Sequence, residues 1–192
     1  MFNNLVKYSD VNVILPMDEK PNKPVKITIT LPTDAYFLSG IRDFTLNMTK
    51  NMTGFSEQWS YRFQSVVDEL CNNAIEHGSA PGEEIILTFI SKADYSFEVV
   101  VEDTGTGINK YTAEQMQELL KEREAVVGDR YMGLRGRGLP KIVAEWTDEL
   151  IFEDRDGGGL KVHAKKYLRK EEDEVILAED KKRDPTHINL TA

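Results

Sequence analysis

The chain has 192 residues, of which 40% are hydrophobic and 30% charged, a composition typical of a single globular domain with a real core. Its net charge of −9 excludes non-specific nucleic-acid binding as a main activity, because a duplex is itself densely negative. No run approaches the ~20 apolar residues of a membrane span, and a single cysteine, Cys71, excludes an internal disulfide, so we expect a cytoplasmic protein that binds neither nucleic acid nor membrane.

The first half of the chain predicts one strand followed by two helices. Residues 25–31 alternate apolar and polar side chains, which is the pattern of a half-buried strand. Residues 32–34 open a helix that extends to about Lys50. A second helix starts with Ser56 as its N-cap and ends at Gly78, which we expect in the left-handed C′ position.

The second half predicts two pairs of strands separated by helical segments. The expected strands cover residues 85–90, 96–103, 149–154 and 160–168. The expected helices between them cover residues 112–127 and 139–146. Because hairpin-linked strands run antiparallel, we predict a mixed, largely antiparallel sheet with helices on one face, which is a two-layer α/β sandwich.

The helix that ends at Gly78 carries a polar stripe beside its apolar one. The stripe consists of Glu69, Asn72, Asn73 and Glu76, at positions i, i+3, i+4 and i+7. Asparagine is a poor residue for a helix interior, and its amide oxygen is a suitable neutral ligand for Mg²⁺. The stripe therefore indicates one wall of a cleft, although a solvated helix face would have a similar composition.

A second signal is the segment VVVEDTGTGI, residues 99–108. By the period of two, Asp103 shares a strand face with Val101, so a carboxylate ends a core-facing row. Such a group must accept hydrogen bonds or shift its pKa, and an adenine amino group is one suitable donor. Gly105 and Gly107 would let the backbone approach a ligand, although a plain Asp-Thr-Gly turn would contain the same residues.

A third signal is MGLRGRGLPKI, residues 132–142, in which glycines and arginines precede a predicted helix. Backbone N–H groups at a helix N-terminus favour anions, and arginines add charge-assisted hydrogen bonds to phosphate. The segment lacks the GxxxxGK[ST] pattern of a P-loop and the βαβ setting of a Rossmann fingerprint. A flexible basic loop is the alternative interpretation.

In this order, ExxxN on a helix, DxGxG after a strand and GxGL before a helix resemble the motifs of the Bergerat-fold (GHKL, histidine-kinase-like) ATPases. The resemblance covers about residues 25–168, which leaves 1–24 as an N-terminal segment and 169–192 as a charged C-terminal tail. Within the superfamily, the segments SVVDELCNNAIEHG and LKVHAKKYL look most like those of the bacterial anti-sigma factor serine/threonine kinases.

The resemblance implies a site for ATP and Mg²⁺. Glu69 would be the general base, Asn73 would hold Mg²⁺ within the nucleotide site, and Asp103 would bind adenine. The other nucleotide-binding residues would be Gly105, Gly107, Ile108, Gly136, Arg137, Gly138 and Leu139. Residues 109–135 would form the lid over ATP, although this segment is long and helix-prone for a lid.

The resemblance also implies the partners of the protein. It would phosphorylate a STAS-type anti-anti-sigma protein, sequester a sigma factor, and form a homodimer through its first helix and the nearby sheet. Arg42 on that helix is similar to a family arginine near the phosphates or the dimer interface. The alternative is a non-catalytic, nucleotide-gated binding module of the same fold. A histidine-kinase catalytic domain is less favoured, since we expect no helical hairpin with a phosphoacceptor histidine before the domain.

Overall fold

The computed structural model describes residues 25–53, 55–92, 96–108, 111–125, 143 and 146–169. The elements in these ranges are β1 (Val25–Pro32), a 3₁₀ turn (Ala35–Phe37), α1 (Leu38–Met52), α2 (Glu57–Asn73), a π-helical turn (Ala74–Gly78), β2 (Glu84–Ser91), β3 (Ser96–Glu102), α3 (Ala113–Ala125), β4 (Glu149–Asp154) and β5 (Leu160–Tyr167). The expected helix at 139–146 lies mostly outside the described residues and stays a prediction. None of the described helices is long and apolar enough to span a bilayer.

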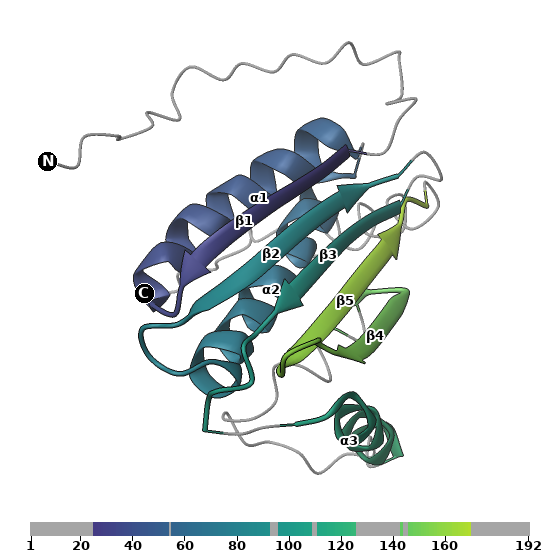
Figure 1. Cartoon of the computed structure of the whole chain (residues 1–192). Coiled ribbons are helices and arrows are strands. Elements are labelled where there is room, and N and C mark those ends of the chain that lie inside the picture. The colour runs from purple at the N-terminus through teal and green to yellow at the C-terminus, as the bar shows by residue number, and fades with distance from the viewer. Residues whose placement is uncertain are drawn as a thin grey trace, which may run out of the picture.

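The five strands form one sheet in the order β1-β2-β3-β5-β4, and each neighbouring pair is antiparallel. Figure 1 shows α1 and α2 side by side on one face of this sheet, with α3 beyond the β4 edge. The predicted two-layer α/β sandwich is therefore confirmed.

The core lies between the sheet and the α1–α2 layer. One row of aligned side chains crosses all five strands and consists of Ile29, Leu87, Val101, Val162 and Phe152. All of them are buried except Ile29, which is partly buried against the same cluster on the β1 edge. The period of two thus places this apolar row on the face that the helices cover.

Helix α2 lies across the centre of this layer. Its N-cap is Ser56, as predicted, because the Ser56 Oγ accepts a hydrogen bond from the Trp59 N–H at 3.3 Å. The helix buries Trp59, Ser60, Phe63, Val66, Val67, Leu70 and Cys71. The buried stripe holds α2 against the sheet and fixes the direction of the polar stripe next to it.

The end of α2 corrects one prediction. Gly78 is not in the left-handed region, and the last turn widens so that the Ser79 N–H donates to the Ala74 carbonyl oxygen at 2.9 Å. Glycine is required here for a different reason, because a Cβ at residue 78 would collide with the side chain of Asp103. The predicted C′ role of Gly78 is wrong, and close packing against the end of β3 replaces it.

Candidate functional site

The first two sequence motifs meet at one end of the sandwich. The Gly107 N–H donates to the Gly78 carbonyl oxygen at 3.1 Å, and the Thr104 N–H donates to the Ser79 Oγ at 3.0 Å. These hydrogen bonds tie the segment after β3 to the end of the α2 helix. Asp103 and the polar stripe of α2 consequently lie at the same end of the molecule.

Glu69 and Asn73 form a hydrogen-bonded pair on this end of α2. The Asn73 amide nitrogen donates to the Glu69 carbonyl oxygen at 2.7 Å and to the Glu69 Oε1 at 3.0 Å. Both side chains are half-buried, while Leu70 and Ala74 on the adjoining face are buried in the core. The amide therefore orients the carboxylate and has its own carbonyl oxygen left over for a ligand.

This donor set suits Mg²⁺ bound together with a substrate. Mg²⁺ favours oxygen ligands, retains several waters, and takes most other ligands from substrate phosphates. Within the described ranges, no group of three His, Cys, Asp or Glu side chains could hold a metal ion by itself. The Asn73 oxygen beside the Glu69 carboxylate fits a metal that arrives with phosphate groups.

Asp103 is buried at the end of the core-facing row, as predicted, with only 9% of its surface exposed. Its Oδ1 accepts hydrogen bonds from the Gly105 N–H at 2.9 Å and the Leu160 N–H at 3.1 Å. Burial raises the pKa of Asp103 above its ordinary value, although the two backbone donors and the charge of Arg155 pull it down. One carboxylate oxygen is thus occupied, and the other is available to accept a hydrogen bond from a ligand.

Gly105 and Gly107 were expected to let the backbone approach a ligand, but in the structure both lie directly against other backbone segments of the protein. A Cβ at Gly105, whose φ is +64°, would collide with the backbone of Gly159, and one at Gly107 would collide with the His77 carbonyl oxygen. Both glycines let backbone approach backbone within the protein, so that approach to a ligand is not needed to explain them. Their assignment to the nucleotide site stays a prediction.

The remaining predicted site residues lie on the surface or outside the described residues. Ile108 follows Gly107 with 88% of its surface exposed, so its side chain lies on the surface of the protein. Gly136, Arg137, Gly138 and Leu139 lie outside the described residues, as do the parts of the predicted lid at 109–110 and 126–135. The described part of the predicted lid contains α3, so the helix expected there is present, and the lid role stays a prediction.

Sequence reasoning missed the contribution of the turn between β4 and β5. Arg155 in this turn donates from Nη1 to the Asp103 carbonyl oxygen at 3.1 Å, and Leu160 after it binds the Asp103 carboxylate. The glycines at 157–159 between two predicted strands are typical of a hairpin turn, and this pattern alone indicates no further role. The available signal was its position before the strand that pairs with the Asp103 strand.

Arg42 is engaged on its own chain. Its guanidinium donates from Nε to the Asp68 Oδ1 at 2.7 Å and from Nη2 to the Asp68 Oδ2 at 2.9 Å. This bidentate pair links α1 to α2 on the exposed side of the helical layer. The expected position of Arg42 near phosphates or a dimer interface therefore stays a prediction.

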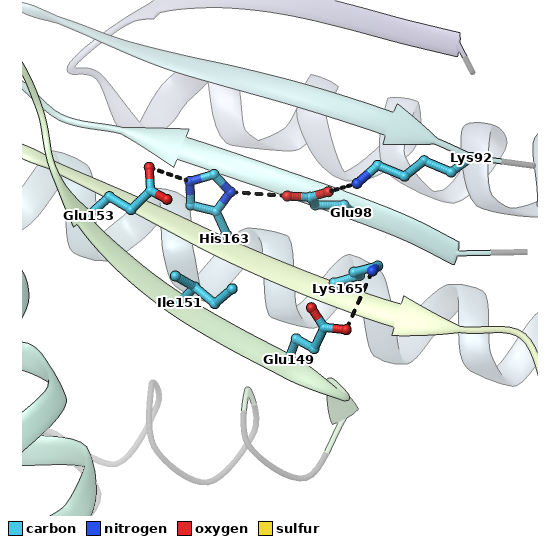
Figure 2. Close-up of a pocket in the computed structure, with 7 residues that line it drawn as sticks. All are labelled: Lys92, Glu98, Glu149, Ile151, Glu153, His163 and Lys165. Atoms are coloured by element: carbon cyan, nitrogen blue, oxygen red, sulfur yellow. Dashed lines mark hydrogen bonds and ion pairs between the residues drawn. The ribbon is translucent and has the colours of Figure 1, made fainter. Parts of the chain in front are cut away.

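A pocket of about 270 Å³ lies away from these residues, on the open face of the sheet. Figure 2 shows that its charges are paired with one another: Glu98 lies between Lys92 at 2.8 Å and His163 at 3.0 Å, and Lys165 contacts Glu149 at 3.4 Å. A solvated, internally neutralised sheet face accounts for this arrangement. The pocket contains none of the motif residues, and we assign the candidate site to the C-terminal end of α2.

Comparison with known proteins agrees with the geometry. The sequence model of the histidine kinase-like ATPase domain matches residues 31–166, which is more than half of the chain. No curated protein matches the chain. The matched range includes the Glu69–Asn73 pair, Asp103 and the described strands, except most of β1 and the last residue of β5. The chain therefore belongs to the histidine kinase-like ATPase domain family, and it is an ATP-binding module of the GHKL type.

Proposed function

We propose that this protein is an ATP-dependent protein serine/threonine kinase that acts as an anti-sigma factor. It would phosphorylate a STAS-type anti-anti-sigma protein and sequester a sigma factor. The observation that carries the proposal is the Glu69–Asn73 pair, in which a carboxylate is held by a neighbouring amide at 3.0 Å within the histidine kinase-like ATPase domain. A carboxylate oriented in this way can accept a proton during transfer, whereas in a module that only binds nucleotide the same residues would serve binding alone.

The chain would contribute positioning and a proton acceptor to the transfer. The Glu69 carboxylate would take the proton of a serine hydroxyl as the serine oxygen bonds to the γ-phosphorus. The bond from that phosphorus to the β–γ bridging oxygen would break, and ADP would leave. Asn73 would hold Mg²⁺, which neutralises phosphate charge when bound. The phosphorylated anti-anti-sigma protein carries about −2 added charge on its surface. This charge would weaken its binding to the kinase, and the kinase would then be free to bind the sigma factor.

Substitution of Glu69 tests the base assignment. Glu69→Gln keeps an acceptor for the Asn73 amide but cannot take a proton, so we expect phosphotransfer to fall by about 10²- to 10⁴-fold with ATP affinity retained. The assay incubates the purified protein with γ-labelled ATP, Mg²⁺ and a lysate of the source organism. Glu76→Gln is the matched control, because Glu76 belongs to the same stripe and is exposed.

The chemistry of the label separates the possible outcomes. A single small labelled protein whose label survives acid, as phosphoserine does, supports the kinase. An acid-labile label would refute the serine/threonine kinase and indicate a protein-histidine kinase instead. A wild-type transfer rate in Glu69→Gln would refute the base assignment. Absence of any labelled protein, while Asp103→Asn abolishes measured ATP binding, would refute the kinase and leave the nucleotide-gated binding module.

The binding module is the second candidate because of α3. The predicted lid contains a helix of 13 residues, Ala113–Ala125, and the Ala113 N–H at its start donates to the Asp154 Oδ1 of β4 at 2.8 Å. A lid helix held at the edge of the sheet could present a surface that depends on the bound nucleotide. A homodimer would be compatible with both candidates, and sedimentation of the protein with and without ATP would test it.

A further inference from the structure

The turn between β4 and β5 is built to approach Asp103 closely. Gly157, Gly158 and Gly159 all have positive φ, at 90°, 105° and 98°. The turn is closed by the Arg155 N–H, which donates to the Gly159 carbonyl oxygen at 2.9 Å. A Cβ at Gly159 would collide with the Asp103 carbonyl oxygen and lie 2.9 Å from Oδ1. Backbone of the turn therefore packs directly on the backbone and carboxylate of Asp103.

Most of the hydrogen bonds that fix Asp103 come from this turn and the start of β5. The Asp103 N–H donates to the Leu160 carbonyl oxygen at 3.0 Å, and the Leu160 N–H donates back to Oδ1 at 3.1 Å. Arg155 Nη1 donates to the Asp103 carbonyl oxygen at 3.1 Å, while its Nε lies 3.6 Å from the Glu102 Oε2. The guanidinium thus holds the main chain of Asp103 and leaves the second carboxylate oxygen to a ligand.

The residue before Arg155 contacts the lid helix. Asp154 Oδ1 accepts the Ala113 N–H at 2.8 Å, which satisfies one of the free donors at the start of α3. Thr112 and Gln115 cap the same turn reciprocally, at 2.9 and 3.2 Å. Figure 1 shows the β4–β5 turn at the same end of the sheet as the end of β3, with α3 next to it. Adjacent residues of one turn therefore reach Asp103 on one side and α3 on the other.

We propose that the β4–β5 turn is a positioning element of the ATP site, in which Arg155 positions Asp103 and Asp154 ties the turn to α3. The proposal rests on the role of Asp103 in binding the adenine base. When the adenine base contacts Asp103, a small shift of Asp103 moves the turn through its hydrogen bonds with Arg155 and Leu160. The turn passes this shift to the start of α3 through the hydrogen bond of Asp154. Packed elements pass such small shifts on because they do not deform continuously.

The charges near Asp103 determine how this can be measured. Arg155 faces Asp103 from the turn. Lys161 of β5 pairs with Glu102, the last residue of β3, at 3.7 Å, and His77 lies in the turn that follows α2. Burial is the largest influence on the pKa of Asp103 and raises it, while Arg155 lowers it. Since the base amino group needs an ionised carboxylate, affinity should fall on acidification, and loss of Arg155 should move that fall to higher pH.

The first experiment measures the affinity of the full chain for an adenine nucleotide with a fluorophore on the ribose, from pH 5 to 8. For Arg155→Ala we expect affinity to fall by about tenfold at neutral pH and the acid midpoint to move upward. Arg155→Lys keeps the charge and should restore the midpoint but only part of the affinity. Asp156→Ala, in the same turn and exposed, should match the wild type.

The outcomes separate this inference from the site assignment. If Asp103→Asn leaves nucleotide affinity unchanged, the assignment of Asp103 to the adenine-binding site is wrong. If Asp103→Asn weakens binding but Arg155→Ala alters neither affinity nor midpoint, the positioning role of Arg155 is refuted while the site stands.

Hydrogen exchange tests the connection to α3. In the wild type, nucleotide should slow the exchange of the amides at 113–117. In Asp154→Ala the nucleotide should still bind, but these amides should no longer respond, and Asp154→Asn should restore the response because its amide oxygen can accept the same bond. Equal slowing in Asp154→Ala, or no slowing in the wild type, would overturn the link.

Discussion

Two carboxylates, Glu98 within strand β3 and Asp103 directly after it, point to opposite faces of the sheet, and each residue has 9% of its surface exposed. Glu98 lies on the open face of the sheet between Lys92 and His163 (Figure 2), whereas Asp103 follows the strand on the helical side and takes two backbone N–H donors. Burial raises the pKa of Asp103, but the partners of Glu98 outweigh its burial and lower its pKa.

The difference lies in the supply of partners, since the degree of burial is the same. Glu98 has its charge neutralised within the protein, so it stabilises the fold and has little left to offer a ligand. Asp103 has one oxygen satisfied and keeps the other, so its carboxylate costs stability that a ligand donor would recover. A buried carboxylate with too few partners marks a site better than a pocket lined by paired charges.

Substitution of Asp103 should give the largest effect. Asp103→Asn keeps an acceptor for the backbone donors but replaces the carboxylate, so we expect ATP affinity to fall by about 100-fold. Because the pKa of Asp103 is raised, the native state binds its proton more readily than the unfolded state, and stability falls as pH rises from the ordinary value of about 4 through the raised one. The neutral variant should therefore be at least as stable as the wild type at pH 7.

Isothermal titration with ATP and thermal unfolding measure the two halves of this prediction. A loss of affinity accompanied by a clear loss of stability would mean that Asp103 is mainly structural, like Glu98. The contrast between the two carboxylates would then disappear.

Gly78 provides the next largest effect, because it separates α2 from Asp103. Gly78→Ala would force a methyl group into the Asp103 side chain, and we expect a loss of about 1–3 kcal/mol in the free energy of unfolding together with weaker ATP binding. Gly40→Ala is the control: Gly40 lies in α1 with open space around it, so alanine should stabilise the helix by about 0.5–1 kcal/mol. Urea denaturation of both variants measures the expected difference in sign.

Local patterns predicted the elements and the orientation of single side chains. The i, i+4 spacing of Glu69 and Asn73 placed both side chains on one stripe, where the structure shows them hydrogen-bonded, and the period of two placed Asp103 on the core face. The reasons for Gly78 and the role of Arg155 were not foreseen, because both depend on contacts between residues far apart in the sequence. Helical and strand periods carry no information on which loop packs against which strand end.

Glu98 tests the structural half of the comparison. Its pKa is lowered, so its contribution to stability is complete above the ordinary glutamate value of about 4.3 and is lost as pH falls through the lowered value. We expect Glu98→Gln to lower the free energy of unfolding by about 1–3 kcal/mol at pH 7 and by much less near pH 3, with ATP affinity unchanged. Glu153→Gln, on the same face but exposed, should change stability by less than about 0.5 kcal/mol. A Glu98→Gln deficit that persists at low pH would show that packing, and not charge, is the cause.

The Arg42–Asp68 pair should give the smallest effect, since both side chains keep contact with solvent, with 46% and 25% exposed. A double-mutant cycle of Arg42→Ala and Asp68→Ala should give a coupling of about 0.2–1 kcal/mol that decreases with salt. Both Nε and Nη2 of Arg42 are engaged by Asp68, so we expect Arg42→Ala to change ATP affinity by less than about twofold. A tenfold loss would instead mean that Arg42 leaves Asp68 for the phosphates, which would give the exposed α1–α2 surface a direct part in the site.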